Sequence, residues 1–185
     1  MKKLMMAIAV VACAAAASAA SFDWKTSATG KVYGAGTTTL LASGTAYIFD
    51  ADAITQQSVV ETFIASGTLK DGSLHSKSIS NGAIAATAGE AFTWSGGETL
   101  NAYFAVIVGD NIYISAAQGQ TALDTGYSQF SFNAKSSSQA AAIEFKAGDS
   151  VSAAGWYTAA AVPEPTSGLL LLLGMAGLAL KRKRA

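Results

Sequence analysis

His75 is the only histidine in the chain and lies in the stretch SLHSKS. A hydrolytic triad would need its imidazole to meet a serine and an aspartate in space. Serines are abundant, but the sequence has no G-x-S-x-G motif, in which many hydrolases present their nucleophile. We therefore expect His75 to be a surface residue on an exposed hairpin strand, and we expect the protein not to be an enzyme.

Metal ligands are also scarce. A zinc site would need more than His75 and Cys13, which precedes the expected mature chain. The stretch DADAITQQ lacks the alternating acids and the glycine of a calcium-binding loop, and no pair of acids is singled out for glycoside hydrolysis. We expect no metal and no cofactor. The aspartates considered as calcium ligands are Asp50, Asp52, Asp71, Asp110, Asp124 and Asp149.

The stretch GAGTTTL, residues 34–40, combines glycines with threonines. It has neither the lysine nor the following helix of a phosphate-binding loop, so it predicts a β-turn. Ice binding would need a flat and regular array of threonines. Thr37, Thr38 and Thr39 are consecutive, so their side chains would point to two different faces of a strand.

Aromatic side chains could stack on sugar rings and make the domain a carbohydrate-binding module. In a small β-domain such side chains more often fill the core. Glycan pull-down would separate the two interpretations. The aromatic residues considered are Trp24, Trp94, Tyr127, Trp156 and Tyr157.

The balanced charge of the chain hides an acidic middle. Residues 21–162 hold six lysines against eleven aspartates and glutamates, a net charge of −5. Binding to phosphate groups requires a cationic face. The composition therefore argues against a nucleic-acid partner.

Residues 1–20 have the features of a secretory signal peptide. Two lysines precede an apolar stretch, and small residues follow, which predicts cleavage after Ala19 or Ala20. A competing interpretation is a lipobox, VVAC, that would make Cys13 a lipidated N-terminus. With ordinary cleavage the mature chain has no cysteine, so it has neither disulfide nor thiol chemistry.

The C-terminal end predicts a membrane-held segment. Residues 168–180 are 13 uncharged residues, fewer than the roughly 20 of a full span, but flanking cations extend the reach of such a helix. The basic cluster Lys181, Arg182, Lys183 and Arg184 predicts a cytoplasmic C-terminus and an exported domain. Pro163 and Pro165 predict an extended, exposed segment before the helix. An unprocessed membrane anchor is the alternative.

These features together resemble the PEP-CTERM sorting signal. The motif Val162, Pro163, Glu164, Pro165 and Thr166 is followed by a Gly/Leu-rich helix, 167–180, and by a basic tail, 181–185. The resemblance implies recognition and removal of the tail by an exosortase-type transpeptidase in the inner membrane. It further implies delivery to the cell surface, often among the exopolysaccharide of biofilms. It covers only residues 162–185.

Residues 21–161 predict an all-β domain, mainly an antiparallel β-sandwich, because short apolar runs alternate with Gly and Ser turns. Asn81-Gly82, Gly109-Asp110-Asn111 and Asp71-Gly72 predict turns. The expected strands are 30–35, 38–43, 45–50, 67–69, 73–80, 83–88, 91–94, 100–108, 111–116, 129–134, 141–146 and 156–160.

Periodicity assigns faces to several strands. Residues 100–108 are apolar on both faces, which predicts a central strand covered on both sides. Phe130 and Phe132 alternate with polar residues, as do Ile143 and Phe145, and each pair should point inward. Helical spacing of apolar residues in 54–65 predicts one short helix laid over the sandwich.

The sequence thus predicts a signal peptide, an exported β-rich domain and a sorting signal. The expected function is a structural or interaction protein of the cell surface or extracellular matrix, linked to exopolysaccharide or biofilm. The expected partners are an exosortase-type enzyme, the inner membrane transiently, and exopolysaccharide.

Overall fold

The computed structural model of the 185-residue chain describes residues 19–87, 89–123, 126–134 and 140–160. Most of the predicted signal peptide, all of the predicted sorting signal 162–185 and its expected helix 167–180 lie outside these residues. Within them, no helix is both long and apolar enough to cross a membrane.

The described chain is mostly β-strand with one short helix, as the sequence predicts. In chain order the elements are β1 (Ala20–Thr26), β2 (Ser43–Asp50), α1 (Gln56–Ser66), β3 (His75–Ser80), β4 (Ala83–Ile84), β5 (Phe92–Trp94), β6 (Thr99–Val108), β7 (Asn111–Ile114), β8 (Gln118–Thr121), β9 (Ser128–Phe132), β10 (Ile143–Phe145) and β11 (Gly155–Ala159).

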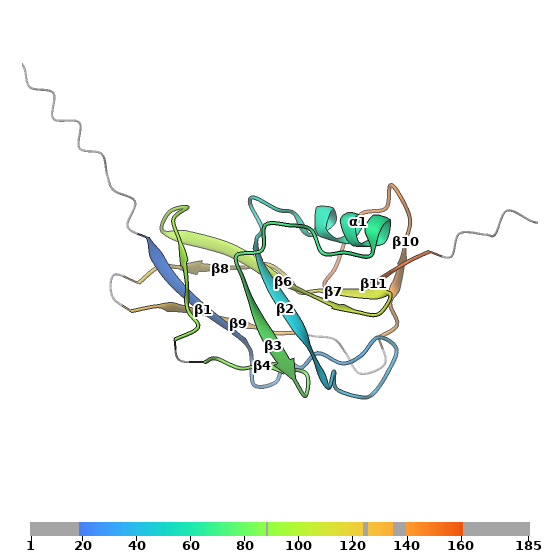
Figure 1. The fold of residues 1–185 in the computed structure, drawn as a ribbon, viewed down its shortest axis with the longest axis horizontal. Coiled ribbons are helices and arrows are strands. Elements are labelled where there is room, and N and C mark those ends of the chain that lie inside the picture. Colours follow the sequence, from blue (N-terminus) through green and yellow to red (C-terminus); the bar gives the residue numbers. More distant parts are fainter. Residues whose placement is uncertain (1–18, 88, 124–125, 135–139, 161–185) are drawn as a thin grey trace, which may run out of the picture.

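The strands form two sheets (Figure 1). A three-stranded sheet has the order β5-β1-β9, and an eight-stranded sheet has the order β10-β11-β7-β6-β2-β3-β4, with β8 also paired to β6. Most pairings are antiparallel, but β1 runs parallel to β9 and β10 runs parallel to β11. One buried apolar cluster includes residues of both sheets, which is consistent with the expected sandwich.

β6 is the central strand of the large sheet and is covered on both faces, as its double apolar pattern predicts. Phe104 and Val106 face the small sheet, whereas Tyr103 and Ala105 belong to the separate cluster beneath α1. The strand end is less covered, and Val108 is 37% exposed.

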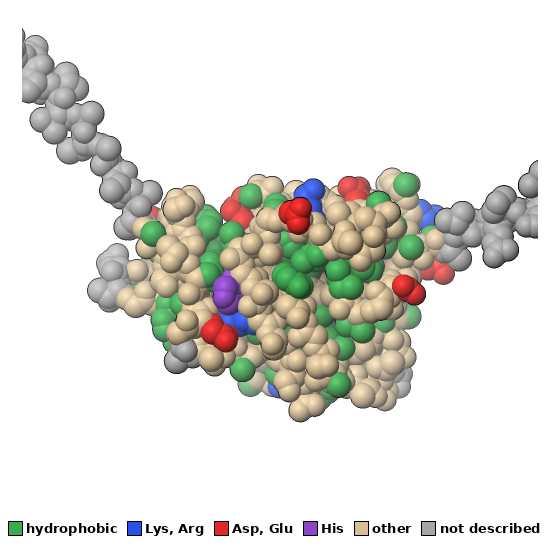
Figure 2. All heavy atoms as spheres, in the orientation of Figure 1, with side chains coloured by type: hydrophobic (Ala, Val, Ile, Leu, Met, Phe, Trp, Pro, Cys, Tyr) green, Lys and Arg blue, Asp and Glu red, His purple; other side chains and the backbone are tan. Residues whose placement is uncertain are grey.

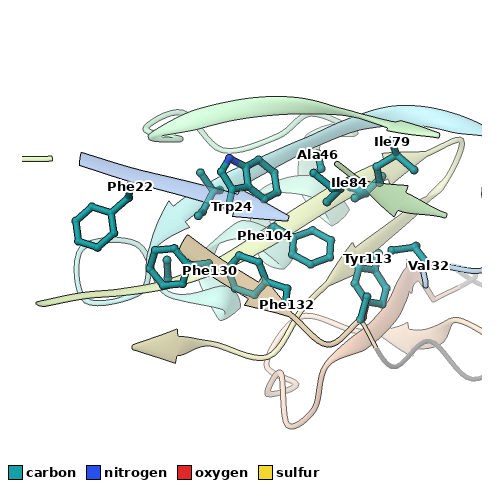
Figure 3. Packing of buried hydrophobic residues seen from close by; sticks show 14 of the residues in the cluster. Phe22, Trp24, Val32, Ala46, Ile79, Ile84, Phe104, Tyr113, Phe130 and Phe132 are labelled. Atoms are coloured by element: carbon teal, nitrogen blue, oxygen red, sulfur yellow. The ribbon is translucent and has the colours of Figure 1, made fainter. Parts of the chain in front are cut away.

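Aromatic rings fill the space between the sheets (Figure 3). The ring of Phe104 lies 6.0 Å from Trp24, 5.3 Å from Phe132 and 5.6 Å from Tyr113, measured between centroids. The rings meet in tilted or edge-to-face geometry, which is favoured because the positive edge of one ring meets the negative face of the next. The two sheets are therefore joined by one aromatic cluster around Phe104.

The predicted helix is confirmed as α1. Its first turn is capped by the Thr55 hydroxyl, which accepts a hydrogen bond of 3.2 Å from the backbone N–H of Ser58. Gly67 ends the helix in the left-handed conformation, with φ of 70°, which glycine adopts without a steric penalty. Val59 and Phe63 pack on the outer face of the large sheet, so the helix closes the second cluster.

Two of the three predicted tight turns are present, and at Asp71-Gly72 the chain shows only a bend. Asn81 and Gly82 have φ of 48° and 69° and connect β3 to β4, as a type I′ hairpin requires. Gly109, with φ of 55°, lies in the connection of β6 to β7. Gly72 has φ of 100°.

Three predicted strands, 30–35, 38–43 and 67–69, are wrong. Tyr33 and Leu40 share only an isolated bridge, because the segment between them folds back through turns and gives no ladder. Residues 67–69 follow directly on the helix end at Gly67. Conversely, β1 and β8 were not predicted, although Phe22 and Trp24 alternate with polar residues in β1.

The predicted inward orientation of Ile143 is also wrong, whereas that of Phe145 is right. Ile143 is 47% exposed because β10 is the edge strand of the large sheet, where the cluster beneath α1 no longer covers it. Phe130 and Phe132 are buried as predicted.

Candidate functional site: a buried lysine–aspartate pair

The structure disperses most of the residues that the sequence suggested for chemistry. Within the described ranges, no three histidine, cysteine, aspartate or glutamate side chains gather as metal ligands. Asp124 lies outside those ranges. Asp50 turns back on its own chain and accepts a hydrogen bond of 2.9 Å from the backbone N–H of Asp52. Asp149 closes a similar turn on the backbone N–H of Lys146, at 2.8 Å.

His75 is not the exposed residue that the sequence predicts. Its Nδ1 accepts a hydrogen bond of 3.4 Å from Trp24 Nε1, and its ring stacks on Phe92 with centroids 5.8 Å apart. The imidazole is therefore half-buried in the joint between β3 and the small sheet. Figure 2 shows the histidine at the surface beside a small group of charged side chains.

Most of the aromatic residues considered for sugar stacking are packed inside. Trp24, Trp156 and Tyr157 are almost fully buried, and Trp156 Nε1 donates a hydrogen bond of 2.9 Å to the Tyr33 carbonyl. Trp94 is half-buried. Of this set only Tyr127 is exposed, at 48%.

A buried ion pair lies where β3 meets β1, and the sequence analysis did not identify it. Lys77 and Asp23 contact each other through Nζ and Oδ1, and their side chains are only 2% and 3% exposed. The second oxygen of Asp23, Oδ2, accepts a hydrogen bond of 3.1 Å from Gln129 Nε2 on β9. Both carboxylate oxygens are thus held by side chains from neighbouring strands.

Two further groups complete the surroundings of the ammonium. Glu90 Oε2 lies 3.7 Å from Lys77 Nζ, and the Glu90 side chain is 48% exposed. Lys77 Nζ also donates to the backbone carbonyl of Ala85 at 3.5 Å. We call these four side chains, Asp23, Lys77, Glu90 and Gln129, the amine–carboxyl cluster.

The electrostatics of the cluster favour the charged form of Asp23. Burial by itself would raise the pKa of this carboxyl. The hydrogen bonds to it, the strongest from Lys77, together with the ammonium charge outweigh burial and hold the pKa below its ordinary value of 3.8. Asp23 therefore stays ionised as long as it remains a separate side chain.

The sequence carried a partial signal for this cluster. In β3 the buried residues Lys77 and Ile79 alternate with exposed serines, so the period of two places the lysine on the inward face. Its partner could not be identified in the same way, because Asp23 lies 54 residues away and outside any predicted strand.

Apart from the amine–carboxyl cluster, the Tyr113 hydroxyl is buried among the aromatic rings between the sheets. The Tyr113 hydroxyl has no hydrogen-bond partner among the described residues, and burial raises the pKa of this phenol well above its usual range. By contrast, Tyr103 donates a hydrogen bond of 2.9 Å to the Ile54 carbonyl.

Comparison with known proteins bears on the C-terminal end of the chain. The PEP-CTERM protein-sorting motif matches residues 161–184. No curated protein and no solved structure matches the chain. The motif begins two residues after β11, which ends at Ala159. The chain is thus an exported protein that carries a C-terminal PEP-CTERM protein-sorting motif for processing by an exosortase-type enzyme.

Proposed function

We propose that this chain is a structural or interaction protein of the bacterial cell surface or extracellular matrix, linked to exopolysaccharide or biofilm and without catalytic activity. The observation that carries the proposal is the sorting motif at residues 161–184, placed directly after the last strand of a β-rich domain. In this arrangement the motif directs the sorting of the domain that precedes it.

The surface of the domain supports a passive role. The face in Figure 2 is mostly uncharged and shows scattered charged side chains. The rings that could grip a ligand instead join the two sheets, as Trp24 and Phe104 do. Of the described residues, only four large hydrophobic side chains are exposed: Val108, Leu123, Tyr127 and Ile143.

The sorting steps assign a role to each part of the motif. Pro163, Glu164 and Pro165 would be recognised by the exosortase-type enzyme. Residues 168–180 would hold the precursor in the inner membrane, and residues 181–184 would stop transfer on the cytoplasmic side. Removal of the tail would then release the domain or attach it to the surface.

The test is replacement of Pro163, Glu164 and Pro165 by alanine in the native cells. We expect the variant to accumulate as a membrane-held precursor, whereas the wild type loses its tail. Mass spectrometry of both termini, after separation of membrane, surface and culture fractions, measures the outcome. Glu98→Ala, a substitution at an exposed acid of the domain, is the control and should mature normally. Normal maturation of the triple variant would overturn the sorting role.

A carbohydrate-binding module is distinguished by a separate measurement. Such a module would have to use Tyr127, because the other rings considered are buried or half-buried. Pull-down with the exopolysaccharide of the native cells should then depend on this ring. Binding that Tyr127→Ala abolishes would favour the module, whereas absence of binding by the wild type favours the matrix role.

A further inference from the structure

The amine–carboxyl cluster places a primary amine against a carboxyl group in an almost water-free site. Lys77 and Asp23 expose only 2% and 3% of their side chains. Removing two charges from water carries a large desolvation penalty, which their attraction repays only partly. A reaction that neutralises both groups would remove this penalty altogether.

The contacts of the cluster fit such a reaction. Lys77 Nζ lies at Oδ1 of Asp23, while Gln129 holds Oδ2 at 3.1 Å. One oxygen is therefore beside the nucleophile, and the other is fixed by a donor that can stabilise negative charge as it develops. Holding the two reactants together replaces a collision in solution by a step within one molecule.

A proton carrier is also present. Glu90 Oε2 lies 3.7 Å from Lys77 Nζ, and its side chain reaches solvent. A carboxylate at this place can accept a proton from the ammonium and return it to a departing oxygen. Its exposure also gives the water that is formed a way out of the cluster.

We propose that Lys77 and Asp23 condense into an intramolecular amide, an isopeptide bond between β3 and β1. Glu90 takes a proton from the ammonium and passes it to Oδ1 of Asp23, so that the free amine attacks Cγ of a neutral carboxyl group. The C–N bond forms, and the bond from Cγ to Oδ1 breaks. Oδ1 leaves as water with the protons that Nζ gives up, one of them carried by Glu90. The ammonium and the carboxylate become one amide and one water, and no oxidant or other reactant is needed.

This bond would be a modification of the exported domain that does not depend on its destination. It would tie the first strand to the large sheet in a chain whose only cysteine is Cys13. A failure of sorting and a failure of the bond would appear in different peptides of one digest, so the two proposals can be tested separately.

The experiment is peptide mapping of the full-length chain, produced in a bacterial host with its own export signals. Trypsin does not cleave after an acylated lysine, so we expect residues 71–135 to remain joined. We also expect them to be linked to the peptide that ends at Lys25. The mass of the linked pair should equal the sum of the two peptides less one water, and fragmentation should place the link at Asp23 and Lys77. Free peptides ending at Lys25 and at Lys77 as the main products would overturn the proposal.

Variants test the role of each group without relying on a single substitution. Lys77→Arg keeps the cation but removes the nucleophile, and it should abolish the link. Glu90→Gln should slow its formation at least tenfold after refolding, whereas the matched change Glu98→Gln, at an exposed acid outside the cluster, should leave the rate unchanged. Equal rates in both variants would overturn the proton transfer by Glu90, and a link that persists in Lys77→Arg would overturn the assignment to Lys77.

Discussion

Phe104 and Lys77 are both almost completely buried, Phe104 among rings between the two sheets and Lys77 against the Asp23 carboxylate of β1. Around Phe104 the neighbours are interchangeable in kind, because any apolar group of similar volume can fill the space. Around Lys77 each polar atom has a particular partner, because an unpaired charge in the same space would be severely destabilising. The comparison shows that equal burial can specify packing in one region and chemistry in another.

The largest effect is expected from removing one partner of the buried Lys77–Asp23 pair. Lys77→Met would leave Asp23 buried without its cation, a loss of about 3–5 kcal/mol. Losing a crosslink across 54 residues would add about 4 kcal/mol by the chain-entropy relation for disulfides. Urea unfolding of the purified protein measures both parts. The double variant Lys77→Met with Asp23→Leu should recover most of the first part, and a double variant as unstable as the single one would contradict this explanation.

In the aromatic region, we expect Phe104→Ala to destabilise the protein by about 4 kcal/mol, since its cavity would open between the sheets. Phe104→Leu, which keeps most of the volume, should lose clearly less. Thermal or urea unfolding of the two variants measures both losses of stability. Equal losses in both variants would mean that ring geometry, and not volume, holds the sheets together.

Lowering the pH should change the stability that comes from the Lys77–Asp23 pair and not the stability that comes from the aromatic region. In Glu90→Gln, measured before the slowed link has formed, the pair is still ionic and the pKa of Asp23 is held below that of the unfolded chain. Its contribution to stability is then fully present above the unfolded value, near 3.8, and is lost as the pH falls through the folded value. The crosslinked wild type should lack this loss. Unfolding midpoints between pH 6 and pH 2 measure the difference, and parallel curves for the two proteins would contradict it.

The smallest effect concerns a buried hydroxyl within the aromatic region, that of Tyr113. Tyr113→Phe removes a buried hydroxyl that has no partner among the described residues, so stability should rise by about 1 kcal/mol. Tyr103→Phe is the control, because it removes a hydroxyl that donates to the Ile54 carbonyl, and it should lower stability by about 1 kcal/mol. A loss of stability in Tyr113→Phe would indicate that a water molecule satisfies this hydroxyl.

Local patterns in the sequence predicted much of the fold. The double apolar pattern of residues 100–108 identified the central strand, and Asn81-Gly82 identified a hairpin, because each depends on neighbours in the chain. The end of the chain identified the sorting motif for the same reason. The pattern of neighbouring residues in the chain was enough to predict these features.

The amine–carboxyl cluster could not be predicted in that way. Asp23 lies 54 residues from Lys77 and 106 from Gln129, so only the folded arrangement brings the three together. The prediction of a strand at residues 30–35 was wrong for the opposite reason, because the apolar residues there make contacts through turns and not through a ladder. Pairing between distant strands decided the first outcome, and local turns decided the second.

The parallel pairing of β1 with β9 also constrains the order in which the domain folds. β1 is the first element of the described chain, but its partners in the small sheet are Phe92–Trp94 and Ser128–Phe132. Contacts of such high contact order form slowly, since a long loop must close before they give any stabilisation. β1 is therefore made early and pairs late, and Phe22 and Trp24 stay uncovered until most of the domain has followed them.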